Sequence, residues 1–143
     1  MARTTSRRKF LCRAAAAASI AIVPRHVLGG QGHVPPSEKT TLAGIGTGGQ
    51  GIQNIYTFLQ IPEVQVVAVC DVNREGHGYL SVNWGMCKEQ RPAGRGPARR
   101  LVEEHYAKEK SSGTYRGCSS YSDFRELLAK EKVDAVMVAT PDH

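Results

Sequence analysis

Three glycines spaced as G-x-G-x-x-G follow an apolar run, and an acidic residue closes the next apolar run. The glycines are Gly46, Gly48 and Gly51, and the acid is Asp71. Glycines at this spacing let backbone N–H groups at the start of a helix approach a diphosphate, and an acid about 20 residues further on can accept hydrogen bonds from a ribose. The pattern therefore predicts a dinucleotide-binding site.

The residues of this turn have separate expected roles. The predicted cofactor-binding turn comprises Gly46, Thr47, Gly48, Gly49, Gln50 and Gly51. We expect Gly46 to make the tight turn after the strand, Gly48 to leave room for the diphosphate and Gly51 to let the helix pack closely on the sheet. Asp71 would bind the adenosine ribose and repel a 2′-phosphate, which favours NAD; the alternative is a turn-forming residue ahead of Asn73.

Strand and helix patterns alternate from residue 40 onward. The expected strands cover residues 40–45, 64–70, 115–118 and 133–139. The expected helices cover residues 49–60, 97–110 and 122–130. This alternation predicts an α/β fold, a Rossmann-type parallel sheet in three αβα layers that stops after its fourth strand. Ser122 is the expected N-cap of the last helix, and Phe124, Leu127 and Leu128 are its expected buried stripe.

The net charge of +6 is located in the first 30 residues, which hold six basic and no acidic residues. The thirteen basic residues that remain balance the thirteen acidic ones. Because nucleic-acid binding depends on a surplus of Lys and Arg on one face, a nucleic-acid partner is not expected. One local basic cluster falls within the long segment 73–97 and its neighbours, and such a run is typical of a solvated loop.

The first 30 residues carry an export pattern. Ser-Arg-Arg-Lys-Phe-Leu at 6–11 precedes an apolar stretch at 14–23 and then Pro-Arg, which resembles a twin-arginine signal. That stretch is too short for a stable membrane span, which takes about 20 residues. We therefore expect a signal at 1–30, a linker at 31–39 and a periplasmic or extracellular location; the alternative is an uncleaved N-terminal tether.

The four cysteines do not have the spacing of a metal site. Cys12 lies in the expected signal, and Cys70 ends an apolar strand, where it is expected to pack as a small hydrophobe. Cys87 and Cys118 could pair in an oxidising compartment. No metal is therefore expected in this chain.

Four segments together resemble the N-terminal half of the Gfo/Idh/MocA oxidoreductase family, which includes glucose–fructose oxidoreductase and inositol dehydrogenase. They are Gly-Ile-Gly-Thr-Gly-Gly-Gln-Gly at 44–51, Val-Cys-Asp-Val-Asn at 69–73, Tyr-Ser-Asp-Phe-Arg-Glu-Leu-Leu at 121–128, and Asp-Ala-Val-Met-Val-Ala-Thr-Pro-Asp-His at 134–143. The resemblance implies that 40–143 is part of an NAD(P)-binding domain of an exported oxidoreductase. It also implies a sugar, polyol or glycoside substrate and, for a complete protein, a homo-oligomer.

The resemblance also implies further site residues. It places the turn glycines on the pyrophosphate and Asp71 on the ribose, with Arg74 beside the adenine, where its charge could pair with the 2′-phosphate of NADP. Thr140 and Pro141 would shape the nicotinamide-ribose end; the alternative is that Thr-Pro only terminates the strand. His143 could line the substrate side, or be no more than an exposed end.

The family pattern continues to a Glu-Lys-Pro motif with the catalytic lysine and to a C-terminal substrate domain, and neither is present in this sequence. No catalytic residue is therefore predicted, and the chain by itself is expected to be inactive. The last strand would have an open edge, which favours aggregation or pairing with another chain. Two other functions remain open, a non-catalytic nucleotide-binding scaffold and an NAD-dependent glycosidase-like lyase.

Overall fold

The computed structural model describes residues 34–77 and 92–141 of the chain. The predicted signal at 1–30, the first part of the linker at 31–39, most of the long loop with Cys87, and His143 lie outside the described residues. The predictions made for those segments stay predictions.

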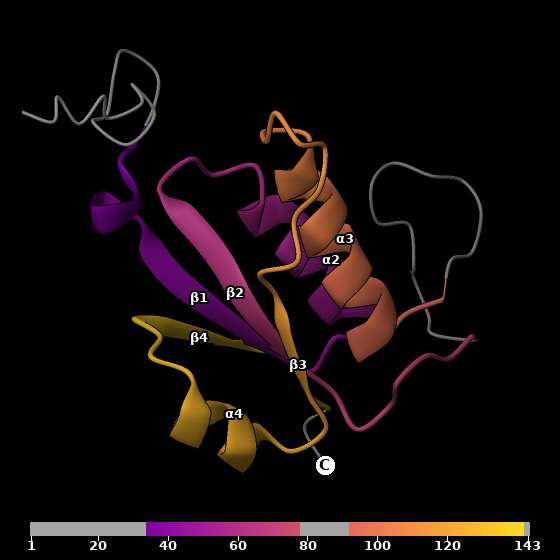
Figure 1. Cartoon of the computed structure of the whole chain (residues 1–143). Helices are drawn as coiled ribbons and strands as arrows, with labels where there is room; N and C mark the ends of the chain where they lie inside the picture. Colours follow the sequence, from indigo (N-terminus) through magenta and orange to yellow (C-terminus); the bar gives the residue numbers. More distant parts are fainter. Residues whose placement is uncertain (1–33, 78–91, 142–143) are drawn as a thin grey trace, which may run out of the picture.

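Four parallel strands form one sheet, in the order β3-β2-β1-β4 (Figure 1). The strands are β1 (Thr40–Ile45), β2 (Val64–Cys70), β3 (Ser119–Tyr121) and β4 (Ala135–Val138). A 3-10 turn, η2 (Pro36–Glu38), precedes β1, and three helices follow, α2 (Gly49–Phe58), α3 (Arg95–Ala107) and α4 (Phe124–Lys130). The predicted α/β fold with a Rossmann-type sheet is confirmed. The chain builds outward from β1 to β3 and then crosses to the other side of β1, so the strand order reverses between β1 and β4.

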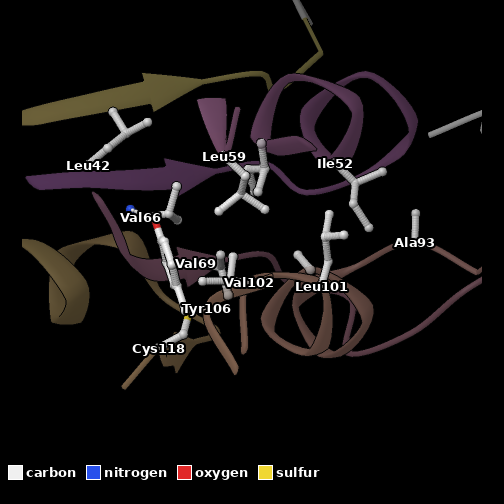
Figure 2. Packing of buried hydrophobic residues seen from close by; sticks show 12 residues of the cluster. Leu42, Ile52, Leu59, Val66, Val69, Ala93, Leu101, Val102, Tyr106 and Cys118 are labelled. Carbon is white, nitrogen blue, oxygen red and sulfur yellow. Dashed lines mark hydrogen bonds between the residues drawn. The ribbon is translucent and has the colours of Figure 1, made fainter. Parts of the chain in front are cut away.

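The sheet lies between two helical layers. Helices α2 and α3 cover one face, where Ile52, Ile55 and Val102 pack against Val66 and Val69 of β2 (Figure 2). Helix α4 lies on the opposite face, and its Leu127 packs against alternate residues of β1 and β2, namely Ala43, Ala68 and Cys70. Successive strand residues point to opposite faces, so the central strands β1 and β2 contribute to both clusters.

A bulge in β2 is stabilised from α3. The pairing of β1 with β2 shifts between Leu42 and Ala43, where β2 carries one extra residue, Val67. Next to the bulge, the buried Val66 N–H donates to the Tyr106 hydroxyl at 2.9 Å. Burial raises the pKa of Tyr106 to about 12, so the phenol remains neutral at physiological pH. The Tyr106 side chain of α3 thus provides an acceptor for the Val66 N–H of β2, which would otherwise be buried without one.

The two ends of the long loop meet at the start of α3. Gly76 and Ala93 form an antiparallel bridge, with hydrogen bonds of 2.9 and 3.0 Å in the two directions. The Gly96 N–H donates to the Arg74 carbonyl at 2.8 Å, and Gly94 has a φ of 120° beside the Asn73 carbonyl. The segment after β2 is therefore fixed against the first turn of α3.

Several predicted boundaries were wrong. The third strand is Ser119–Tyr121 and not 115–118, because Tyr115 packs edge-on against Tyr106 at the rim of the core, with ring centroids 5.2 Å apart. Helix α2 ends at Phe58, and α3 begins two residues before Pro97 and ends at Ala107. The fourth strand is shorter than predicted, Ala135–Val138.

Two predictions about α4 were also wrong. The N-cap is Asp123, whose carboxylate accepts from the Arg125 N–H at 2.8 Å, and not Ser122. Leu127 is buried as predicted, but Phe124 and Leu128 are 42% and 49% exposed. The short helix contacts the sheet through a narrow stripe and leaves its flanking apolar residues open.

Among the residues that the structure describes, no helix has the length and apolar character to cross a bilayer.

Candidate functional site

A pocket of about 520 Å³ lies at the carboxyl ends of the strands. Its lining comes from the ends of β1, β2 and β4 and from the starts of α2 and α4: Ile45, Gly46, Gly48, Gly49, Gln50, Cys70, Asp71, Val72, Asn73, Ser122, Phe124, Ala139, Thr140 and Pro141. The pocket includes the point where the strand order reverses, between β1 and β4. Open α/β sheets bind ligands at this point.

The turn between β1 and α2 has no room for side chains at two of its glycines. Gly46 has a φ of 80°, and a Cβ there would lie 2.6 Å from the Ala139 carbonyl oxygen. A Cβ on Gly51 would overlap the Gly46 carbonyl. The turn therefore has the tight geometry and close packing that the glycine spacing predicts, independently of any ligand.

The start of α2 opens into the pocket. Gly48 precedes the helix with a φ of −65° and a ψ of −159°, and α2 has no side-chain cap at this end. The Gly48 carbonyl accepts the first helical hydrogen bond, from the Ile52 N–H at 3.0 Å. The N–H groups of a helix's first turn have no partner within the helix and give that end a partial positive charge. Since Gly49 and Gln50 line the pocket, this positive end borders it.

Asp71 joins the end of β2 to the glycine turn. Its Oδ2 accepts from the Thr47 N–H at 2.7 Å and lies 3.4 Å from the Thr47 hydroxyl. Its Oδ1 accepts from the Asn73 N–H at 2.8 Å, which is the turn-forming contact weighed as the alternative. Asp71 nevertheless lines the pocket, whereas Thr47 is fully buried and does not.

The start of helix α3 holds these segments in place through hydrogen bonds to their backbone carbonyls. The Arg95 guanidinium donates through Nη1 to the carbonyls of Asp71 and Val72, at 2.9 and 2.8 Å. The Gly94 N–H donates to the Thr47 carbonyl at 2.9 Å. The start of α3 thus fixes the backbone of both segments that Asp71 connects.

The pocket brings together most of the predicted site residues. Thr140 and Pro141 line it beside the glycine turn. Thr47 and Gly51 are buried within the turn and are not in the lining. Arg74 is exposed and lies outside the lining, and His143 is not among the described residues.

Sequence reasoning missed Ser122 and Phe124. Both line the pocket after the end of β3, and the Phe124 ring carries the Arg125 guanidinium 4.6 Å from its centroid. Helical spacing placed Phe124 in the core, together with Leu127 and Leu128. The available signal was its position directly after a parallel strand, since the carboxyl ends of such strands meet at one edge.

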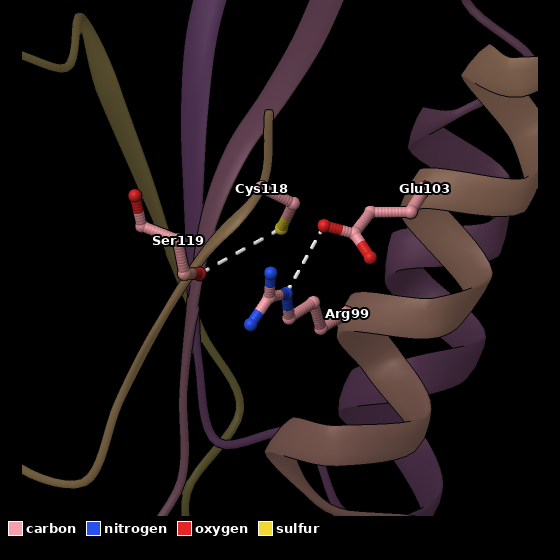
Figure 3. Close-up of polar contacts among 4 residues, drawn as sticks. All are labelled: Arg99, Glu103, Cys118 and Ser119. Carbon is pink, nitrogen blue, oxygen red and sulfur yellow. Dashed lines mark hydrogen bonds and ion pairs between the residues drawn. The ribbon is translucent and has the colours of Figure 1, made fainter. Parts of the chain in front are cut away.

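The two described cysteines are free, buried thiols. Burial, and to a lesser extent Asp71, raises the pKa of Cys70, which packs in the core beneath the pocket. Burial raises the pKa of Cys118 to about 12, and its Sγ donates to the Ser119 carbonyl at 3.7 Å, beside the Arg99–Glu103 ion pair (Figure 3). Both thiols are therefore protonated at neutral pH, which makes them poor nucleophiles.

Comparison with known proteins gave no match to a protein-family model, a curated protein or a solved structure.

Proposed function

We propose that this chain binds NAD in the pocket at the carboxyl ends of its strands, with NADP as the alternative. One observation carries the proposal: the glycine turn, the uncapped start of α2 and the Asp71 carboxylate all border a single pocket at the reversal of the strand order. Glycine turns and helix starts bind phosphates, and acids at the end of the second strand bind ribose hydroxyls.

In this proposal different residues bind different parts of the dinucleotide. N–H groups of Gly49 and Gln50 would hold the diphosphate, and the Asp71 carboxylate would accept from the adenosine ribose hydroxyls. Thr140 and Pro141 would border the nicotinamide-ribose end. The pocket volume of about 520 Å³ falls within the usual size of small-molecule sites.

NAD is favoured over NADP by the charges that face the pocket. Asp71 lines it, and a carboxylate at this position repels a 2′-phosphate. Arg74, the predicted partner for such a phosphate, lies outside the lining. The negative group is therefore at the site and the positive one is not.

We further propose that the chain is the nucleotide-binding part of an exported oxidoreductase of the Gfo/Idh/MocA family, acting on a sugar, polyol or glycoside. The resemblance of segments 44–51, 69–73, 121–128 and 134–143 supports the reaction class, and the parallel sheet is compatible with it. The twin-arginine pattern in residues 1–30 supports export.

Titration of the full chain with NADH, followed by nicotinamide fluorescence, tests the binding proposal. The diagnostic variant is Gly48→Ala, because a φ of −65° accepts alanine and the fold should survive. We expect the added methyl group to occupy the space of the diphosphate and to weaken NADH binding by about tenfold or more, roughly the loss of one charge-assisted hydrogen bond.

The matched control is Thr57→Ala, an exposed position near the other end of α2, which should bind NADH like the unmodified chain. Circular dichroism establishes that each protein is folded. A folded, unmodified chain with no affinity for NADH or NADPH would overturn the proposal.

A further inference from the structure

We infer that Asp71 is a positioning residue for the glycine turn as well as a ribose ligand, so that one carboxylate couples the ribose site to the diphosphate site. The inference rests on the proposed function for its ligand and on the structure for its geometry. It assigns to Asp71 a role that does not require a ribose to be present.

The Thr47 backbone is fixed on both sides. Its N–H donates to Asp71 Oδ2 at 2.7 Å, and its carbonyl accepts from the Gly94 N–H at 2.9 Å. Thr47 is fully buried, and the Asp71 carboxylate is the acceptor of its N–H, so removal of the carboxylate would take that acceptor away. A buried donor without an acceptor is costly, so the turn would shift to satisfy it.

That shift would reach the phosphate-binding groups directly. Thr47 lies between Gly46 and Gly48, and Gly48 precedes the first turn of α2. On the other side of Thr47, the Gly46 N–H donates to the Cys70 carbonyl at 2.9 Å, which ties Gly46 to the end of β2. Movement at Thr47 therefore passes to Gly48 and to the N–H groups that follow it.

The same carboxylate keeps capacity for a ribose. A carboxylate has about four acceptor positions. Oδ1 accepts from the Asn73 N–H, and Oδ2 accepts from the Thr47 N–H with the Thr47 hydroxyl further away, at 3.4 Å. Oδ1 therefore retains a position for one hydroxyl of a vicinal diol, and a second hydroxyl would replace the long Thr47 hydroxyl contact on Oδ2, so the two roles are compatible.

A pair of nucleotides separates the two roles. ADP carries the ribose diol, and 2′,3′-dideoxy-ADP lacks it but keeps the diphosphate. Calorimetry would measure both on the full chain and on Asp71→Ala, Asp71→Asn and the control Glu75→Gln. Glu75 lies on the same segment and pairs with Arg100, at 3.1 Å.

We expect Asp71→Ala to weaken 2′,3′-dideoxy-ADP about tenfold and ADP about a hundredfold, because ADP also loses its ribose contacts. Asp71→Asn keeps one amide oxygen for the Thr47 N–H, so it should lie between Asp71→Ala and the unmodified chain. Glu75→Gln should change neither affinity.

Hydrogen exchange at the Thr47 N–H gives a readout that needs no ligand. We expect Asp71→Asn to speed this exchange about tenfold or more while the amides of β1 and β2 exchange as before, since the loss is local. Global destabilisation would speed all of them together.

The outcomes distinguish the two proposals. If Asp71→Ala weakens ADP and leaves 2′,3′-dideoxy-ADP unchanged, the positioning role is wrong and the ribose role stands. If the folded, unmodified chain binds neither nucleotide, the proposed function is wrong, and exchange at Thr47 decides the positioning role: unchanged exchange overturns it, and local acceleration supports it.

Discussion

The two faces of the sheet are covered unequally. On the face of α2 and α3, Ile52, Ile55 and Val102 are fully buried. On the face of α4, Leu127 is fully buried, but Leu128 remains 49% exposed. The first face is a closed hydrophobic core, and the second is only partly covered by the described residues.

The edge strand β4 shows the same difference within four residues. Ala135 and Met137 pack against the core of α2 and α3, whereas Val136 and Val138 point the other way and are 38% and 63% exposed. Phe124, another exposed residue of this open face, lines the pocket. The closed face thus anchors the glycine turn through α2, and the open face supplies an accessible wall of the candidate site.

The strongest test of this comparison truncates one large apolar side chain on each face. Ile55→Ala should lower the free energy of unfolding by about 2–5 kcal/mol, because it creates a cavity in a closed core. Leu128→Ala should change it by no more than about 0.5 kcal/mol, because the side chain is already half exposed. Urea denaturation of both variants measures the difference. Equal losses would show that α4 packs as tightly as α2.

A smaller loss of unfolding free energy is expected when the polar contact within the closed face, between Tyr106 and Val66, is removed. Tyr106→Phe keeps the ring but removes the acceptor of the buried Val66 N–H, and should cost about 1–3 kcal/mol of unfolding free energy. Tyr115→Phe is the control, since it keeps the edge-on ring contact and leaves the Val66 bond in place. If both variants were equally stable, the bulge in β2 would not depend on α3.

The central strands and the glycine turn could be predicted from sequence, and the periphery could not. The bounds of β1 and β2 follow from apolar runs that end in turn signals, and Gly46 and Gly51 follow from their spacing. The bounds of β3 depend instead on register, because Ala68 of β2 pairs with Ser119. Local pattern favoured a strand at Tyr115, which packs against α3.

The candidate site could likewise be predicted from sequence only in part. Asp71 was found by its spacing from the glycines, but its contact with Thr47 joins residues 24 positions apart, and only the paired strands bring them together. Phe124 has the spacing of a core residue, and the narrow contact of a short helix leaves it in the pocket lining. Residue types identify the candidates, and tertiary packing decides which of them face the ligand.

The smallest expected effect concerns the amino end of β4, where polar contacts tie the edge strand to β1. Asp134 Oδ2 accepts from the Thr41 N–H at 2.8 Å and from the Thr41 hydroxyl at 2.6 Å. These hydrogen bonds hold the pKa of Asp134 below its ordinary value of 3.8. Because the folded-state pKa is the lower one, the contribution to stability is present above the ordinary pKa and is lost as the pH falls through the folded-state value.

Denaturation of the full chain and of Asp134→Asn at about pH 7 and about pH 3 measures that contribution. The unmodified chain should be the more stable at the higher pH, and its advantage should shrink at the lower pH as Asp134 becomes protonated. Other carboxyl groups titrate in both proteins, so the difference between the two isolates Asp134. A difference that does not change with pH would mean that the edge strand is held by its backbone pairing with β1 and not by this carboxylate.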